Sequence, residues 1–474
     1  MFRGRRQAGL PGRRWRQDSP VQRPAPRLAR ESDLEGRRGA ALPPTPAQWS
    51  MLAAAVTALA AGLSAAPVAT LTLLHHLLFG LFALAALSRL LASALATGPS
   101  PVARLSDAAL PTYTVLVPLY GEAAIAGDLI TALEAIDYPR DRLRILIVLE
   151  ADDGDTRRAF DALPLPEFIE VLIAPPGAPR TKPRACNIGL EQATGELLTI
   201  YDAEDRPGPG QLREAAARFA AGSPRLACLQ APLRIDPDRR WLPAQFALEY
   251  ALQFEVLLPA LTRLGLPFPL GGTSNHFRIQ ALRAVGGWDA WNVTEDADLG
   301  FRLAAEGYAM GMLATPTREP APPALVDWLP QRARWIKGYM QTFGVQSRQP
   351  PHWRTGAAAA FGLTLGVALV AAFLHGPLLA WLIVTFLLGV TSGGPWIAPH
   401  DGALLVTGWA CAAIAGMAGL RRAGGRIGAG TILSTPVYWA LHSLAAAHAL
   451  VQLVVCPHRW DKTAHVARTG QARA

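Results

Sequence analysis

The chain has 474 residues, of which 51% are hydrophobic and 17% are charged, and its formal net charge is +9. Soluble domains usually carry about 25% charged residues, so this composition excludes an ordinary soluble protein of this length and favours one with a membrane part. The positive charge is concentrated in residues 1–47, which hold eleven arginines and four acids. Nothing besides this charge favours nucleic-acid binding, and we expect none.

Residues 1–47 mix arginine with proline and glycine and show no apolar period, which is typical of a disordered basic tail. We expect this tail to lie in the cytoplasm, against anionic lipid headgroups. The next segment, residues 48–95, contains the uncharged run Met51–Ser88. A helix needs about 20 apolar residues to cross a membrane, so this run of 38 residues, interrupted by Pro67, predicts a hairpin of two transmembrane helices.

Residues 107–350 form the water-facing part of the chain, because thirty of the 36 acids lie between Asp107 and Asp327. Short β-branched runs alternate there with helical stretches, which predicts an α/β domain with a mostly parallel sheet. The expected strands are Tyr113–Val117, Leu143–Glu150, Ile169–Ala174, Leu197–Asp202 and Leu226–Ala231. The expected helices are Ala123–Ala135, Pro183–Ala193, Gln211–Ala220, Trp241–Leu264, Ala297–Glu306 and an amphipathic segment, Leu325–Thr342.

Three further uncharged runs lie in residues 356–456, namely Gly356–His400, Gly402–Leu420 and Ile427–His458. The first has 45 residues and contains His375-Gly376-Pro377, so we expect two helices from it and four from the whole region. Six spans in total would return a basic tail, residues 457–474, to the cytoplasm. The same count places Arg421–Arg426 outside, against the positive-inside rule, and one of the later segments is therefore alternatively interfacial or re-entrant.

Acidic side chains follow the fourth expected strand directly, at Asp202, Glu204 and Asp205. Ligands of parallel sheets bind beyond the carboxyl ends of the strands, and acids two positions apart in an extended segment point the same way. Mg²⁺ and Mn²⁺ prefer oxygen ligands and bridge carboxylates to substrate phosphates. The pattern predicts a divalent-cation site for a diphosphate; solvated acids at the start of a loop are the alternative.

Five motifs, in order over residues 112–345, resemble the membrane-bound branch of the family 2 glycosyltransferases, which includes cellulose synthase and related bacterial polysaccharide synthases. The motifs are Val117–Glu122, Asp152-Asp153-Gly154, Lys182–Asn187, Thr294-Glu295-Asp296 and Gln331-Arg332-Ala333-Arg334-Trp335. The resemblance implies a GT-A-type domain with a mixed, mostly parallel sheet, inserted between about two transmembrane helices before it and about four after it.

The resemblance also implies a catalytic base. Asp296, with Glu295 beside it, would take the proton from the acceptor hydroxyl. The alternative interpretation of this acidic segment is a helix N-terminus, which would lower the pKa of Asp296.

Binding roles follow from the same resemblance. The nucleotide sugar would contact Tyr120, Glu122, Asp152, Asp153, Lys182 and Arg334. The acceptor would contact Gln331 and Trp335, the indole being suited to stacking on a sugar ring. The alternative for this motif is an interfacial helix anchored by Trp and Arg at the headgroup layer.

The segment Gly271–Phe277 occupies the place of the aromatic-rich acceptor loop of cellulose synthase, but its residues differ. It resembles instead a bacterial exopolysaccharide-synthase subgroup, as does the closing segment Pro457–His465. We expect Thr273, Ser274, Asn275 and His276 to contact the acceptor, although His276 is alternatively a polar loop residue. Glu204 stands where the family often has Asp, so either Glu204 or Asp205 is the second metal-site acid.

These observations predict an inverting glycosyltransferase of the cell inner membrane, with a cytoplasmic catalytic domain, a UDP- or GDP-linked sugar donor and Mg²⁺ or Mn²⁺ as cofactor. The expected acceptor is a growing polysaccharide that is exported through the helices, with accessory export proteins as candidate partners. Transfer to a lipid carrier or glycolipid is the alternative, and an inactive transporter or scaffold is a third interpretation. The donor sugar is not identified by the sequence.

Overall fold

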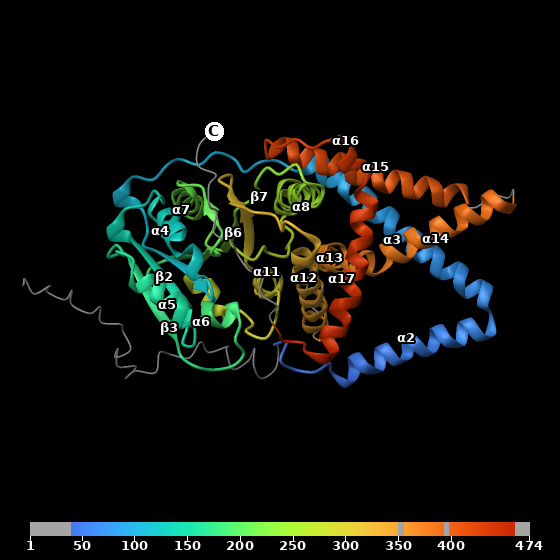
Figure 1. The fold of residues 1–474 in the computed structure, drawn as a ribbon, viewed down its shortest axis with the longest axis horizontal. Coiled ribbons are helices and arrows are strands. Elements are labelled where there is room, and N and C mark those ends of the chain that lie inside the picture. Colours follow the sequence, from blue (N-terminus) through green and yellow to red (C-terminus); the bar gives the residue numbers. More distant parts are fainter. Residues whose placement is uncertain (1–38, 349–354, 393–397, 460–474) are drawn as a thin grey trace, which may run out of the picture.

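The computed structural model describes residues 39–348, 355–392 and 398–459, so the predicted tails, residues 1–47 and 457–474, lie mostly outside the described residues. An α/β domain occupies one end of the molecule, and long apolar helices extend from it towards the other (Figure 1). The α/β domain stands between helices that precede and follow it in the chain, as the sequence predicts.

A seven-stranded sheet with the strand order β3-β2-β1-β4-β8-β6-β9 forms the centre of the α/β domain. Its strands are β1 (Tyr113–Leu119), β2 (Leu143–Glu150), β3 (Ile169–Ala174), β4 (Leu197–Ile200), β6 (Leu226–Gln230), β8 (Asn275–Arg278) and β9 (Ala309–Met312). Neighbouring strands are parallel except for β8, which is antiparallel to β4 and β6. The five expected strands are confirmed. The strands β8 and β9 lie outside them, because neither segment has a run of β-branched residues.

The two faces of the sheet pack against different helices, because successive side chains of a strand point in opposite directions. Val115 and Val117 of β1 pack with helices α4 (Ala126–Glu134), α5 (Gly154–Asp161) and α7 (Gln211–Ala221). Leu116 packs on the other face with α6 (Lys182–Gln192), α10 (Ile279–Ala284) and α11 (Glu295–Ala305). Burial of both faces explains the almost wholly apolar strands, and parallel pairing brings the carboxyl ends of β1, β2 and β4 to one edge.

A second, three-stranded sheet has the order β5-β10-β7. It consists of β5 (Arg206–Pro207), β10 (Thr317–Glu319) and β7 (Leu233–Ile235). Because β5 directly follows the acids at positions 202–205, β10 brings Glu319 within electrostatic range of them.

One long helical segment joins the α/β domain to the membrane helices. It comprises α8 (Trp241–Leu252), a π-helical turn η5 (Gln253–Leu257) and α9 (Leu258–Arg263), close to the expected helix Trp241–Leu264. It packs against α3 (Pro67–Leu95) and α15 (Pro399–Arg422). Gly416 and Gly419 of α15 allow this approach, since a Cβ at either position would overlap Leu248 or the backbone of Ala251.

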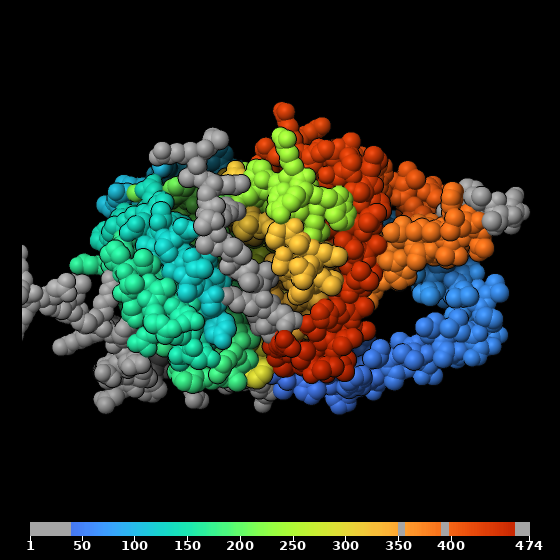
Figure 2. All heavy atoms as spheres, viewed as in Figure 1, coloured from blue at the N-terminus to red at the C-terminus, as the bar shows by residue number. Residues whose placement is uncertain are grey.

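Five helices of the described residues are long and apolar enough to cross a membrane. They are α2 (Pro46–Ala65), α3, the continuous segment Gly356–Gly389, α15 and α17 (Thr435–Val455). The segment Gly356–Gly389 lies within α13 (Thr355–Phe361), the π-helical turn η6 (Gly362–Gly366) and α14 (Val367–Ser392). The predicted hairpin in residues 48–95 is present as α2 and α3. Figure 2 shows an opening that separates α2 from α14.

The expected count of four later spans is wrong for the described residues, because Gly356–His400 does not form two helices. Pro377 lies inside the continuous helix α14. A proline removes one backbone donor and disturbs the preceding turn, but partners from a neighbouring helix can replace such bonds. The Ser443 hydroxyl does so here: it donates to the Ala372 carbonyl (2.6 Å) and accepts from the Gly376 N–H (2.8 Å).

Helix α17 differs from the other four apolar helices, because both of its ends contact the α/β domain. Ser434, before its first turn, accepts a hydrogen bond from the Trp241 indole (2.7 Å). After its last turn, the Pro457 carbonyl accepts from Gln341 (3.0 Å). Between these points α17 packs along α12 (Leu325–Gln346). In Figure 1 it runs across the direction of α2, α3, α14 and α15.

The arginine cluster after α15 lies on the same side as the α/β domain. The Arg422 guanidinium donates to the carbonyls of Glu255 (2.9 Å), within η5, and of Ala96 (2.8 Å), directly after α3. The short helix α16 (Ala429–Leu433) then leads into α17. Because α17 contacts the α/β domain at both ends, it is the later segment that best fits the interfacial alternative considered for Arg421–Arg426.

Candidate functional site

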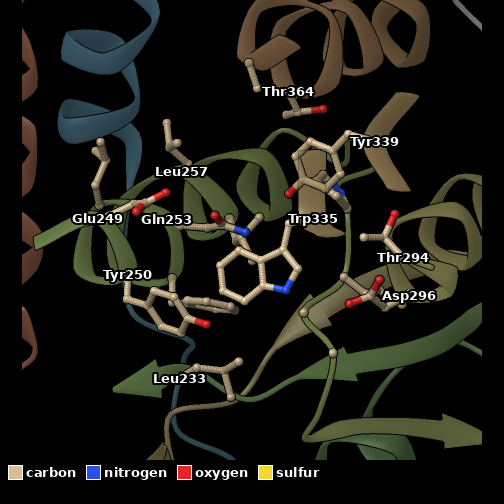
Figure 3. A pocket seen from close by; sticks show the side chains of 18 of the residues that line it. Leu233, Glu249, Tyr250, Gln253, Leu257, Thr294, Asp296, Trp335, Tyr339 and Thr364 are labelled. Atoms are coloured by element: carbon tan, nitrogen blue, oxygen red, sulfur yellow. The ribbon is translucent and has the colours of Figure 1, made fainter. Parts of the chain in front are cut away.

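A cavity of about 810 Å³ begins at the carboxyl edge of the main sheet and continues between the membrane helices. Eleven of the predicted site residues line it: Tyr120, Glu122, Lys182, Asp202, Glu204, Thr273, Glu295, Asp296, Gln331, Arg334 and Trp335. Figure 3 shows Trp335 projecting into this space between Tyr250 on one side and Asp296 on the other. Residues from four of the five motifs therefore meet in one place.

Asp296 lies in the first turn of α11, with its carboxylate directed into the cavity. Its Oδ1 accepts the Ala297 N–H (2.8 Å), and its Oδ2 faces Gly272, where an added Cβ would lie 3.4 Å away. Burial raises the pKa of Asp296 to about 6, against the lowering influence of the Ala297 N–H and of Lys182. The expectation that the helix N-terminus would lower the pKa of Asp296 below its ordinary value is wrong. The helix N-terminus does lower this pKa, but burial raises it by more.

Glu295 is the more strongly perturbed of the two neighbouring acids. Burial, and then the charge of Asp296, raise the pKa of Glu295 to about 8. At neutral pH Glu295 is therefore mostly protonated, while Asp296 is mostly ionised. An ionised carboxylate with a pKa just below neutral is the form that a general base requires.

The position of α11 depends on a close approach to α12. A Cβ on Gly338 of α12 would lie closer than van der Waals contact to the side chain of Thr294, the residue that precedes α11. The Asn292 amide and the Val293 N–H are also bonded to Thr342 (2.9 Å) and Gln341 (3.0 Å) of α12. These contacts hold the motif containing Asp296 against the helix that carries Arg334 and Trp335.

Lys182, at the start of α6, supplies positive charge at the centre of the site. Its ammonium group donates to the Gly272 carbonyl (2.6 Å) and forms an ion pair with Asp202. Burial alone would lower the pKa of Lys182, but Asp202 and Glu295 raise it above its ordinary value. Arg334 faces the same acids, and burial lowers its pKa while Glu295, Asp202 and Asp296 oppose that change. Two cationic side chains therefore lie beside these acids at the cavity wall.

The predicted metal acids divide into two kinds. Asp202 and Glu204 line the cavity. Asp205 is buried beneath it, where its Oδ2 accepts from the Asp202 N–H (2.7 Å) and from the Thr273 hydroxyl. The structure therefore favours Glu204 over Asp205 as the second metal-site acid and gives Asp205 the role of shaping the loop.

A further acid, Glu319, joins this group and was not expected from the sequence. Burial raises the pKa of Glu319, and repulsion from Asp205, Glu204 and Asp202 adds to the shift. Among the described residues, no hydrogen-bond donor reaches Glu319 Oε1 or Asp205 Oδ1. Buried carboxylate oxygens without donors, in a cluster of four acids, are suited to a hard divalent cation, and Asp202 and Glu204 could hold one. The sequence around Glu319 gives little indication of this role, because Glu319 lies in a proline-rich stretch far from the five motifs.

These acids do not form a closed cage of protein ligands. In the described part of the chain, three potential metal-ligating side chains lie close together elsewhere: His75, His400 and Asp401, on α3 and α15. Their ligand atoms all lie within 4.8 Å of one another. A cation at Asp202 and Glu204 would therefore need further oxygens from the substrate.

The predicted nucleotide residues are only partly brought together. Tyr120 and Glu122, after β1, line the cavity. Asp153 is buried, and its carboxylate accepts the N–H groups of Gly121 (2.5 Å) and Thr156 (3.2 Å), so it shapes the loop that carries Tyr120. Asp152 is not among the cavity-lining residues of the described chain and forms an ion pair with Arg180. Two residues that the motifs do not include, Arg180 and Glu150, line the cavity instead.

Three predicted acceptor residues lie in the core of the sheet. His276 of β8 lies between the Tyr113 hydroxyl (2.6 Å) and the side-chain Oε1 of Gln211 (3.0 Å), and burial lowers the pKa of His276 to about 3. Ser274 shares a hydrogen bond with the Thr317 hydroxyl (2.6 Å), and Asn275 donates to the Gly271 carbonyl (2.5 Å). The acceptor assignment of Ser274, Asn275 and His276 is therefore corrected to a structural one, because strand pairing buries them. Thr273 remains at the cavity wall.

Four of the five residues of the motif Gln331–Trp335, Arg332 among them, lie at the cavity wall. Gln331, Arg334 and Trp335 line the cavity, and Trp335 also packs on Phe246 and Tyr250 with ring centroids 6.0 and 6.3 Å apart. Arg332, which the resemblance left without a role, lies 4.5 Å from the Trp335 ring centroid. It is therefore a positioning residue for the indole.

Arg332 is held by a buried network that reaches three helices. It donates two hydrogen bonds of 2.7 Å to the carboxylate of Glu249 on α8. The Tyr438 hydroxyl of α17 donates to the same carboxylate (2.6 Å) and accepts from Trp328 (3.2 Å). Burial would raise the pKa of Glu249, but Arg332 and His442 lower it to about 2.

Beyond Trp335 the cavity wall becomes largely aliphatic. Leu91 and Ala92 of α3 line it, together with Leu363, Val367 and Ala368 of η6 and α14 and Ala412 of α15. Figure 3 places Thr364, from the same helical segment, above Trp335 and Tyr339. The polar site around Asp296 therefore opens directly into a space between apolar helices.

Comparisons with known proteins add to this geometry. Residues 197–420 match the family model described as Glycosyl transferase family group 2. The chain is similar to a β-monoglucosyldiacylglycerol synthase of Synechocystis sp., with 30% identity over 52% of this chain and 52% of that protein. It is also similar to the cellulose synthase catalytic subunit of Pseudomonas fluorescens, with 30% identity over 49% of this chain and 32% of that protein.

A mannosyltransferase from Pyrobaculum calidifontis, solved in complex with GDP-Man and Mn²⁺, is similar over 79% of this chain and 97% of that chain, with 20% identity and a TM-score of 0.49. The chain spans about half the length, or less, of the curated relatives it matches. The sheet topology and the family match confirm the predicted fold class, an α/β domain of GT-A type with apolar helices before and after it. They also confirm the predicted glycosyltransferase domain.

Proposed function

We propose that this chain, which carries a glycosyltransferase family 2 domain, transfers a sugar with inversion from a nucleotide donor to a hydroxyl group of a lipid acceptor in the membrane. The observation that carries the choice of acceptor is the continuity of the cavity from Asp296 to the aliphatic walls of α3, α14 and α15.

The donor side follows from the charges at the sheet edge. Lys182 and Arg334 face the acids of the site and would hold the diphosphate of a UDP- or GDP-linked sugar. Tyr120 and Glu122 lie at the mouth of the same cavity, beside the carboxyl end of β1, where a nucleoside would bind. A divalent cation held by Asp202 and Glu204 would neutralise charge on the departing diphosphate.

The chemical step needs one base and a stabilised leaving group. The Asp296 carboxylate takes the proton from the acceptor hydroxyl as that oxygen attacks the anomeric carbon of the donor. The bond from this carbon to the diphosphate oxygen breaks on the opposite side, so the configuration inverts and the nucleotide diphosphate departs. Lys182 and Arg334 remain in place to stabilise the negative charge that develops on the leaving group.

A lipid acceptor is favoured over a polysaccharide by the nature of the walls beyond Trp335. A sugar chain would leave its hydroxyl groups against Leu91, Val367 and Ala412 without hydrogen-bond partners, and unpaired buried polar groups are costly. Hydrocarbon is suited to the same surface. The resemblance to polysaccharide synthases and the indole of Trp335 favour the second candidate, elongation of a polysaccharide.

We place the catalytic domain in the cytoplasm. Arg421–Arg426 lies on the domain's side of the helices, since Arg422 contacts Glu255 and Ala96. Loops rich in Arg and Lys remain on the cytoplasmic side of membranes, and nucleotide sugars are made there.

Product analysis tests this proposal. Purified protein in lipid nanodiscs is incubated with radiolabelled nucleotide sugars, and label is measured in the organic phase and in ethanol-insoluble polymer. We expect label in a single-sugar lipid that Asp296→Asn lowers at least about 100-fold, whereas the surface control Asp155→Asn does not. Long polymer in place of labelled lipid would establish the second candidate.

A substitution in the cavity wall tests the acceptor route separately. Ala368→Trp would fill the aliphatic part of the cavity and should block lipid glycosylation while slow hydrolysis of the donor persists. Ala380→Trp, on the exposed surface of the same helix α14, is the matched control. Equal activities of the two variants would contradict a lipid in the cavity.

A further inference from the structure

Arg89 is a charged side chain placed among the apolar walls of the cavity. It lies within α3, six residues before the end of that helix, and it directly follows the long uncharged run of the N-terminal hairpin. Its side chain lines the cavity and is half-buried. An ionisable residue in a transmembrane helix is rare, and it usually faces an interior space and has a functional partner.

The guanidinium of Arg89 has no anionic partner among residues 39–348, 355–392 and 398–459. The interaction that the structure gives it is with the Trp439 ring of α17, whose centroid lies 6.0 Å from its central carbon. Other arginines at the same boundary are matched: Arg332 is paired with Glu249, and Arg234 with Glu255. Glu249 also lines the cavity, but both of its oxygens are bonded to Arg332. The planar guanidinium of Arg89, with its five N–H donors, therefore faces the cavity without a hydrogen-bond acceptor among the described residues.

A histidine lies near this arginine, and a second histidine lies near the first. His375 of α14 stacks on Trp439 with ring centroids 5.2 Å apart, and it lies within electrostatic range of Arg89 and His442. His375 and His442 both line the cavity. His442 faces the Glu249 carboxylate (3.8 Å) and the Tyr438 carbonyl (3.1 Å), so Arg89 and His375 are the polar groups left to face a ligand. The cluster Arg89, His375 and Trp439 comes from three helices, and a guanidinium beside an imidazole is suited to a phosphate group.

We propose that the cluster Arg89, His375 and Trp439 binds the phosphate group of an anionic lipid, and that this lipid is the acceptor. The naming of the acceptor rests on the proposed function, but the binding site does not. The lipid phosphate accepts hydrogen bonds from Arg89, the hydrocarbon lies among the apolar helices, and the acceptor hydroxyl extends past Trp335 to Asp296. A neutral lipid would leave the guanidinium without an acceptor in an apolar space.

Equilibrium binding tests the site without requiring sugar transfer. The thermal stability of the full chain in a neutral detergent is measured with dodecyl phosphate, with dodecanol and with inorganic phosphate. A ligand that binds the folded state raises the Tm. We expect dodecyl phosphate to raise the Tm and the other two compounds to leave it unchanged.

Variants then assign the effect to Arg89. Loss of hydrogen bonds to a charged group should weaken dodecyl phosphate binding roughly 10- to 100-fold in Arg89→Gln. Arg89→Lys keeps the charge and should retain part of the shift, and the exposed control Arg421→Gln should keep all of it. If Arg89→Gln does not fold, the comparison of the three compounds on the unsubstituted protein still decides between the outcomes.

Three results would overturn the proposal. An equal shift with dodecanol would mean that the site recognises only hydrocarbon, and an equal shift with inorganic phosphate would mean a site for free phosphate. An undiminished shift in Arg89→Gln would place the phosphate elsewhere. None of these results depends on turnover, so failure of the phosphate site is distinguishable from absence of glycosyl transfer.

Discussion

Lowering the pH should switch off this site in a range where an ordinary aspartate would remain active. Burial raises the pKa of Asp296 to about 6 from its usual 3.8. A general base acts only in its deprotonated form, so activity is present above this pKa and is lost as the pH falls through it. The direction of this pKa shift is opposite to that expected for an aspartate stabilised by a helix N-terminus.

The magnitude follows from the ionised fraction of Asp296. With a pKa of about 6, about nine-tenths of the carboxyls are ionised at pH 7 and about one-tenth at pH 5. The turnover number should therefore fall about tenfold between these values. With an ordinary aspartate pKa it would fall by less than about one-tenth over the same range.

The assay is the initial rate of sugar transfer at saturating donor, from pH 5 to pH 7 at constant ionic strength, because Glu295, with a pKa of about 8, ionises above this range. Binding of the nucleotide diphosphate is measured in parallel by calorimetry, because Lys182 and Arg334 keep their charge over this range. Affinity should change much less than turnover. A profile that stays flat down to pH 5 would refute the argument that Asp296 is a buried base.

Four further outcomes are expected. Gly338→Ala should push α11 away from α12 and lower kcat/KM about 10- to 100-fold, although it touches no substrate, which steady-state kinetics would show. Glu249→Gln should destabilise the fold by about 2–3 kcal/mol, because Arg332 loses a charged acceptor, as thermal unfolding would reveal. Excess EDTA should abolish transfer and Mg²⁺ or Mn²⁺ restore it, and full activity in chelator would contradict a metal site. In intact cells, an impermeant thiol reagent should label Ala66→Cys but not Ala423→Cys.

The sequence predicted those parts of the fold that local periodicity determines. The strands β1, β2 and β4 are apolar runs followed by acids, so both the sheet and the convergence of Glu122, Asp202 and Glu204 could be predicted before their geometry was known. The same reasoning could not place His276, because Gly-Gly-Thr-Ser-Asn-His has the composition of a polar loop. Only its pairing between β4 and β6, which are distant in sequence, buries it.

The remaining differences between prediction and structure also arise from contacts between segments that are distant in the sequence. Glu319 belongs to the site through the pairing of β10 with β5 and β7, and Arg332 through its ion pair with Glu249 of α8. No spacing in the sequence reveals either contact. Composition gave the length and hydropathy of α17 but not its direction, which depends on Trp241 and Gln341 at its two ends. The fusion of two expected helices at Pro377 depends on Ser443, 66 residues later along the chain.

The packing of α12 against α17 means that the catalytic domain and the membrane part cannot be separated by cutting the chain between them. Trp328, Ala333 and Ile336 form one core with Tyr438, Ala445 and Ala449, so a fragment ending after α12 would expose an apolar stripe along its whole length. Trp335, which packs against this core, lines the cavity together with Arg334. A water-soluble truncation would therefore lose the helices that support this cavity, and detergent or lipid is a structural requirement for assaying the proposed activity.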